Sequence, residues 1–196
     1  MTDPRLALAI AAIDEANADD PATIEVDGVT RPKEQAHAEL MTKWVQHFDP
    51  DADAAQLVAA RAHHLRRWTI ARDEYPDGRA GYLRWRAALK RQHAEEVASI
   101  LADVSYDHGV VQKVQQIIRK EGLGTDPAVQ THEDALCMVF LTTQFDDLIS
   151  RLGEDRAVEV VAKTVAKMSE RARSEALALP LSATGAAVVE RALAPG

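Results

Sequence analysis

Residues 32–48 read P-K-E-Q-A-H-A-E-L-M-T-K-W-V-Q-H-F, and this stretch decides what kind of fold the chain has. Its larger side chains recur at spacings of three and four residues, which is the period of a helix with one buried face. Pro32 is tolerated in the first turn of such a helix, and Asp49-Pro50-Asp51 ends it. The face that we expect to be buried consists of His37, Leu40, Met41, Trp44, Val45 and Phe48.

The same helical period dominates the rest of the chain, and a strand signal occurs at residues 23–30. There T-I-E-V-D-G-V-T alternates around Asp27-Gly28, which is typical of a short hairpin. The sequence therefore predicts one all-α domain over residues 1–196, a helical bundle with a short N-terminal β-hairpin. Further helices are expected over residues 6–16, from Asp51 or Asp53 to about 68, over 79–104, from Asp107 to Gly122-Leu123-Gly124, from Asp126-Pro127 to Gly153, over 154–168, from Ser169 to about 179, and over 183–193.

Length and composition fit an ordinary globular protein of 196 residues, with 46% hydrophobic and 28% charged residues. The single cysteine, Cys137, excludes an internal disulfide and fits a reducing compartment, so we expect a cytoplasmic protein. No apolar run reaches the roughly 18 residues that a membrane span needs, and no signal peptide is recognised at the start. The net charge of −8 argues against binding of extended duplex nucleic acid. The oligomeric state cannot be derived from the sequence.

Positive charge is concentrated between residues 61 and 91, a segment that we call the arginine island. It holds nine Lys or Arg against three acidic residues, so the rest of the chain carries −14. Four of the nine aromatic residues of the protein also lie there. Arginine suits planar, bidentate contact with phosphate or carboxylate, which predicts a local anion site. A solvated helix face is the alternative interpretation. The candidate ligand-binding residues are Arg66, Arg67, Trp68, Arg72, Arg79, Tyr82, Trp85 and Arg86, with Lys120 and Lys163 as further cations.

Ionisable side chains stand on the buried faces of four different predicted helices: His37, His64, His93 and Asp134. Each alone is more often a hydrogen-bonded core residue than a ligand. Burying four unpaired polar groups is costly, which favours their convergence on one another, on a metal or on a substrate. Imidazole and carboxylate together bind metals such as Zn²⁺, Mn²⁺ or Fe²⁺. Glu133 is the neighbour of Asp134, and since adjacent helical residues differ by about 100°, one of the two should point away.

A specific family resemblance follows from these motifs. R-A-H-H-L-R-R-W at 61–68, Tyr75-Pro76, Gly81-Tyr82 and Trp85-Arg86 resemble the family called domain of unknown function 4202 (DUF4202). Val26-Asp27-Gly28, Pro32-Lys33-Glu34, Arg72, Arg79, His93, Glu133-Asp134-Ala135, Cys137, Val139-Phe140-Leu141, Lys163-Thr164 and Lys167-Met168-Ser169 continue the match, so that it covers nearly the whole chain. The resemblance supplies a family and no activity.

The order of the histidines and the aspartate is also similar, more loosely, to that of the HD-domain metal-dependent phosphohydrolases. In that family a His-Asp pair follows the first histidine, whereas His63-His64 stands here, so the carboxylate of the pair is missing. The resemblance implies His64, His93 and Asp134 as metal ligands, with His37 a weaker one. Glu34 or Glu39, close to His37, could supply an oxygen instead.

Together these features predict a hydrolase of the HD type acting on a small phosphorylated, nucleotide-like molecule, with a divalent transition metal as a possible cofactor. His64, Asp134 and Glu133 would be catalytic, and the arginine island would hold phosphate. The first alternative is a binding module without catalysis, which recognises an anionic ligand or an RNA end with the same basic pocket. The second is an interaction protein whose arginines pair with acidic residues, although exposed ion pairs stabilise little.

Overall fold

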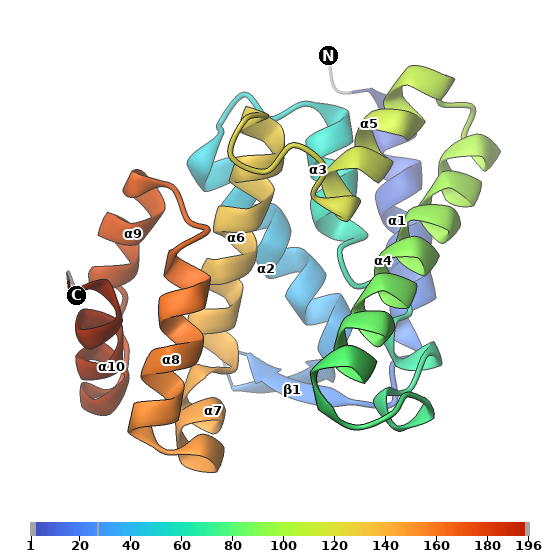
Figure 1. The fold of residues 1–196 in the computed structure, drawn as a ribbon. Helices are drawn as coiled ribbons and strands as arrows, with labels where there is room; N and C mark the ends of the chain where they lie inside the picture. The colour runs from blue at the N-terminus through green and yellow to red at the C-terminus, as the bar shows by residue number, and fades with distance from the viewer. Residues whose placement is uncertain (1–2, 27, 195–196) are drawn as a thin grey trace. The chain divides into compact units, whose positions relative to one another are not determined.

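The computed structural model describes residues 3–26 and 28–194, and it is helical apart from a two-stranded hairpin near the N-terminus (Figure 1). The predicted all-α fold with a short hairpin is thus confirmed. The chain divides into two compact units, residues 1–122 and 123–196, and each is described by itself. The prediction that both form one domain stays a prediction.

The first unit places five α-helices and the hairpin around a shared core. Figure 1 follows the chain from α1 in blue to α5 in yellow-green. Small and branched side chains without exposed surface form the core, among them Ala9, Ile13, Val58, Leu65, Val97, Leu101, Val114 and Ile117. In chain order the elements are α1 (Pro4–Ala18), β1 (Thr23–Val26), β2 (Val29–Pro32), α2 (Lys33–Phe48), α3 (Ala54–Arg61), the 3₁₀ turns η1 (Arg67–Thr69) and η2 (Arg72–Glu74), α4 (Gly78–Asp103) and α5 (His108–Arg119).

The start of α2 is fixed by a buried aspartate, Asp20, from the loop between α1 and β1. The hairpin pairs Thr23 with Pro32 and Val26 with Val29, and α2 begins at the next residue. Pro32 offers no side-chain cap, but Asp20 Oδ2 accepts a hydrogen bond from the backbone N of Glu34 at 2.9 Å. This bond satisfies one of the amides that a helix N-terminus leaves unpaired. The hairpin turn residue Asp27 lies outside the described residues.

The third helix is shorter than predicted. Asp53 caps it with Gln56 in a capping box, as one of the two expected capping residues, but α3 ends at Arg61 and not near residue 68. Arg66 then adopts a left-handed conformation with φ 48°, which no α-helix can contain. Arg66 N donates to Asn17 Oδ1 of α1 at 3.0 Å, so a long-range contact outweighs the helical pattern of this segment. His63 and His64 therefore lie in a turn.

The loop between η2 and α4 approaches α4 closely because residue 81 is glycine. A Cβ atom at Gly81 would come within 1.8 Å of the carbonyl oxygen of Pro76. Arg72 braces the same loop by donating to the carbonyl oxygens of Tyr75 and Pro76 at 2.8 and 3.2 Å. The loop is thereby held against the N-terminal part of α4.

The second unit consists of five helices, and it differs from the prediction at one break. A single helix was expected from Asp126 to Gly153, but the chain turns at Gln144, which has ψ −3° and caps α6. Phe145 then begins a new helix and is buried. The helices are α6 (Pro127–Thr143), α7 (Phe145–Leu152), α8 (Glu154–Val165), α9 (Glu170–Leu177) and α10 (Ala183–Leu193). Among the described residues, no helix combines the length and the apolar character needed to cross a membrane.

Candidate functional site

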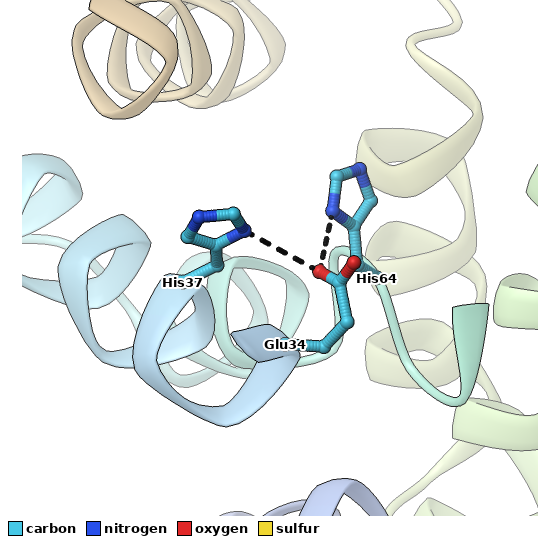
Figure 2. A group of neighbouring side chains, drawn as sticks. All are labelled: Glu34, His37 and His64. Carbon is cyan, nitrogen blue, oxygen red and sulfur yellow. Dashed lines mark hydrogen bonds and ion pairs between the residues drawn. The ribbon is translucent and has the colours of Figure 1, made fainter. Parts of the chain in front are cut away.

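A buried carboxylate lies between two histidines in the first unit (Figure 2). Glu34 and His37 come from the first two turns of α2, and His64 comes from the turn after α3. Glu34 Oε2 is 2.8 Å from His64 Nδ1 and 3.5 Å from His37 Nδ1, so both imidazoles contact the same carboxylate oxygen. The side chains of Glu34 and His37 are 7% and 4% exposed, whereas that of His64 is 17% exposed. We call these three residues the Glu-His-His cluster.

The cluster combines an ionised carboxylate with a neutral His64. Burial alone would raise the pKa of Glu34, but the neighbouring His64 and His37 outweigh it and hold that pKa well below its usual value. Burial lowers the pKa of His64 to about 4, against the opposing effect of Glu34. Because an ionised carboxylate can only accept, the proton of neutral His64 sits on Nδ1. Its Nε2 is then an acceptor, and Arg67 Nη1 lies 3.3 Å from it.

A cationic cleft adjoins the cluster through His64. It lies between the turn after α3, one face of α4 and the end of α5, and its cavity volume is about 10 Å³. This is room for about one water molecule, so a phosphoryl group would extend into the open mouth of the cleft. No acidic side chain lines it within the described residues. Its walls are His63, His64, Arg67, Arg86, Leu89, Lys90, His93, Ile118 and Lys120.

Three residues hold Arg67 in place: His64, Trp85 and Glu34. Its guanidinium carbon lies 4.8 Å from the centre of the Trp85 ring, and its Nε is 3.8 Å from Glu34 Oε1. The indole of Trp85 is itself anchored, because its Nε1 donates to the carbonyl oxygen of Ile70 at 3.0 Å. Burial lowers the pKa of Arg67 from its ordinary value, but arginine stays charged in proteins. Trp85 therefore acts as the platform beneath an arginine.

Lys120 reaches the cleft from a strained backbone position. It follows α5 with φ 61°, the left-handed conformation that glycine usually supplies at the end of a helix. The predicted end at Gly122-Leu123-Gly124 thus falls two residues too late. A residue other than glycine in this left-handed backbone conformation costs about 1 kcal/mol relative to glycine. A lysine at this position is consistent with a side chain that is retained for its charge.

Lys120→Gly should therefore stabilise the protein and weaken the cleft at the same time. We expect the free energy of unfolding to rise by about 1 kcal/mol, since the backbone strain is relieved. Affinity for inorganic phosphate should fall, because one cation leaves the cleft. Urea unfolding followed by circular dichroism and phosphate titration calorimetry measure the two effects. Lys120→Gln is the matched control, which loses the charge and keeps the strain. A glycine variant that is less stable than this control would contradict the interpretation.

Several predicted ligand residues of the island lie outside the walls of the cleft. Arg66 lines a different surface hollow, with Glu15, Asp19 and Glu96. Arg72 braces the loop, Arg79 is exposed on α4, and Trp68 is half-buried in η1. Tyr82 is 45% exposed, and its ring centre is 5.9 Å from that of Trp85. The structure thus brings Arg67, Arg86 and Lys120 together, with Trp85 against Arg67 and Tyr82 against Trp85.

The predicted acidic residues belong to the second unit. Asp134 Oδ1 accepts from Gln130 Nε2 and from the backbone N of Ser169, each at 2.9 Å, and so ties α6 to the start of α9. Glu133 Oε1 is 3.8 Å from Lys167 Nζ. Both carboxylates are buried, at 2% and 3% exposure, although one of the two was expected to point away. The reason is that α6 is buried around most of its circumference at this level, as a helix without a solvent face would be. Lys163 is exposed on α8.

Glu34 and Lys90 are charged residues of the site that were not among the primary candidates. Glu34 was considered only as a substitute ligand, although E-x-x-H at 34–37 places a carboxylate and an imidazole on one helix face, which is a usable signal. Lys90 shares a face of α4 with Arg86 and His93, at spacings of four and three residues. Glu39, the other substitute, is engaged by Arg31 at 2.5 and 2.6 Å. It therefore serves an ion pair beside the hairpin.

The Glu-His-His cluster has the donor set of a metal centre. One ligand atom from each residue lies within 4.8 Å of the others, and one oxygen with two nitrogens suits Zn²⁺, Mn²⁺ or Fe²⁺. Three protein ligands would leave a coordination position for water or substrate. Of the predicted metal ligands, His37 and His64 belong to this group. His93 does not, and its ring centre lies 6.1 Å from that of His64.

Fold and site together define a class: an all-α protein with a basic cleft backed by a buried carboxylate and imidazoles. The sequence profile of the domain of unknown function DUF4202 matches residues 7–189, so the chain belongs to that family. The predicted family is thereby confirmed. None of the curated proteins and none of the solved structures that were compared matches the chain.

Proposed function

We propose that this protein is a hydrolase of small phosphorylated, nucleotide-like molecules, assisted by a divalent metal at the Glu-His-His cluster. The observation that carries the proposal is that His64 belongs both to the cluster and to the wall of the cationic cleft. An anion in the cleft would thus lie next to groups that bind a metal or accept a proton. The similarity to HD-domain phosphohydrolases points to the same chemistry and stays a prediction.

The cleft residues would bind and polarise a phosphoryl group. Arg67 and Arg86 can each donate two parallel hydrogen bonds to its oxygens, and Lys90 and Lys120 add point charges. Charge that develops on these oxygens in the transition state would meet cations that are already in place. Trp85 keeps Arg67 oriented in the absence of ligand, which reduces the conformational entropy lost on binding.

Glu34, His37 and His64 would hold the metal, and a metal there supplies a Lewis acid and lowers the pKa of bound water. Without metal, the Glu34–His64 pair would orient His64 with Nε2 toward the cleft as a proton acceptor. In both cases the buried carboxylate fixes the imidazole.

The test combines metal content with phosphate release. Purified protein should contain about one equivalent of Zn, Mn or Fe by elemental analysis, and His64→Ala should lose it. A panel of nucleoside and sugar phosphates should include at least one compound that releases phosphate, and a chelator should stop this release. Arg67→Met should reduce phosphate affinity at least tenfold, because an arginine that contacts phosphate is lost while its apolar stem stays on Trp85.

Arg84→Met is the matched control for the arginine variant. Arg84 is exposed on α4, the helix that carries Arg86. It lies two residues, and hence about 200° around the helix, from Arg86, so its loss should leave phosphate affinity unchanged. Phosphate binding without hydrolysis of any compound would favour the binding module over the enzyme. Equal affinity in wild type and Arg67→Met would remove the cleft from the proposal.

A further inference from the structure

His93 is a buried histidine whose second nitrogen has no protein partner. The residue is 3% exposed on α4, and its Nδ1 is 2.8 Å from the carbonyl oxygen of Leu65. A carbonyl oxygen only accepts, so the proton sits on Nδ1. Burial and the neighbouring His64 lower the pKa of His93 to about 3, so the ring is neutral at physiological pH. Nε2 therefore carries a lone pair, and this atom has no hydrogen-bond partner within the described part of the chain.

An unsatisfied buried acceptor destabilises the fold, so we expect His93 Nε2 to meet a ligand in the cleft. Three kinds of ligand could use the lone pair: a metal ion, a hydrogen-bond donor or an electrophilic atom. A cation at His93 Nε2 would meet the like charges of Arg67, Arg86, Lys90 and Lys120, and none of the described residues that line the cleft is a carboxylate that could balance them. The oxygens of a fully ionised phosphate are acceptors, as Nε2 is, and cannot share a hydrogen bond with it.

The electrophilic centre of an anion that these cations attract is phosphorus. We propose that His93 Nε2 accepts the phosphoryl group of a ligand bound in the cationic cleft and forms a covalent phosphohistidine. This inference rests on the proposed function for the class of ligand and adds the nucleophile. It requires no metal, because the lone pair is present in the neutral ring.

The Nε2 lone pair forms an N–P bond while the P–O bond to the leaving group breaks, and the leaving oxygen keeps the electron pair and takes a proton from water. The ring becomes an imidazolium whose Nδ1–H stays on Leu65 O, which favours the charged form. Water then attacks phosphorus, and the N–P electron pair returns to Nε2. Phosphate leaves, and the proton released by the attacking water neutralises the hydroxide that formed when the leaving oxygen took its proton.

The neighbouring groups suit this chemistry. Arg67 and Arg86 would hold the phosphoryl oxygens and reduce their repulsion toward the nucleophile. Leu65 is fully buried, so the carbonyl that orients the ring is itself fixed by packing. The imidazole is therefore preoriented, and the nucleophile needs no separate base to remove a proton.

The test uses phosphoramidate, a small donor that phosphorylates histidine, with the full-length protein in the presence of a chelator. We expect one phosphoryl group per chain by intact mass, mapped to His93 and showing the stability of phosphohistidine, which survives alkali and is lost in acid. Excess inorganic phosphate should slow the reaction by occupying the cleft. His93→Asn, whose amide can still donate to Leu65 O, should reduce incorporation at this site to background.

His108→Ala is the matched control, because His108 is exposed at the start of α5 and outside the cleft. It should retain full labelling at His93. Circular dichroism checks that both variants fold. Labelling confined to exposed His47 and His108, or equal incorporation in wild type and His93→Asn, would overturn the proposal. Phosphate release from a compound of the substrate panel without phosphohistidine would support the proposed hydrolase and contradict His93 as its nucleophile. Labelling of His93 without phosphate release from any compound would support the nucleophile and contradict the hydrolase.

Discussion

Glu34→Ala should lower the free energy of unfolding by about 3 kcal/mol, which is the effect of removing one partner from a buried charged network. The Glu34 side chain is 7% exposed, and its carboxylate accepts from His64 at 2.8 Å and lies 3.8 Å from Arg67. Without it, the guanidinium of Arg67 and the Nδ1–H of His64 lose their buried acceptor. Urea unfolding of chelator-treated protein at pH 7 measures the loss.

Further variants test whether the charge of Glu34 and its pairing with His64 account for the loss of stability. Glu34→Gln keeps an oxygen that can accept from His64 and should be less destabilising than Glu34→Ala. In a His64→Ala background, Glu34→Ala should cost at least 1 kcal/mol less than in wild type, because the pair is already broken. Glu25→Ala, at an exposed position of β1, should change stability by no more than about 0.5 kcal/mol. Additive effects at Glu34 and His64 would contradict the coupling drawn in Figure 2.

Stability of the chelator-treated protein should fall steeply as the pH is lowered from 7 to 4.5. The pKa values of His64 and His93 are lowered to about 4 and about 3, below the ordinary value near 6.5. Unfolded chains therefore bind protons before folded ones, and the unfolding free energy decreases with falling pH. Each histidine should contribute about 2 kcal/mol over this window.

Glu34 acts in the same direction, but in a lower pH window. Its lowered pKa stabilises the fold above the ordinary glutamate value, and this contribution is lost only below about pH 4.5. The slope of the unfolding free energy against pH between 6.5 and 4.5 therefore reports on His64 and His93. His93→Asn should remove about half of it, and His108→Ala should leave it unchanged. A stability that is flat or rises toward pH 4.5 would show that the two imidazoles are not held neutral.

Much of the fold was predictable because helical periodicity is a local property. The last helix, residues 183–193, and the hairpin at 23–26 and 29–32 agree with the sequence pattern. The errors fall where a distant contact overrides the pattern. Asn17 binds the backbone of Arg66, 49 positions away, and ends the predicted third helix early. Such contacts leave no periodic trace in the sequence.

The sequence predicted which residue types the site contains, but it predicted only in part which of these residues lie together. Arg67, Arg86 and Lys120 were expected to bind an anion and line one cleft, whereas Arg66 and Arg72 from the same segment are used elsewhere. The segment after α3 is a turn, so spacing along the chain does not tell which way each arginine points.

By itself, the sequence determined the helical class and the concentration of arginine and aromatic residues, since both follow from composition and short-range spacing. The family was recognised from its motifs along the chain and from the profile match. Tertiary structure decided which carboxylate accompanies His64. That residue is Glu34, 30 positions earlier, whereas Asp134 binds the start of α9 in the second unit. The physical reason is that partners of a buried charge are chosen by three-dimensional proximity, where an unpaired ion is costly, and not by distance along the chain.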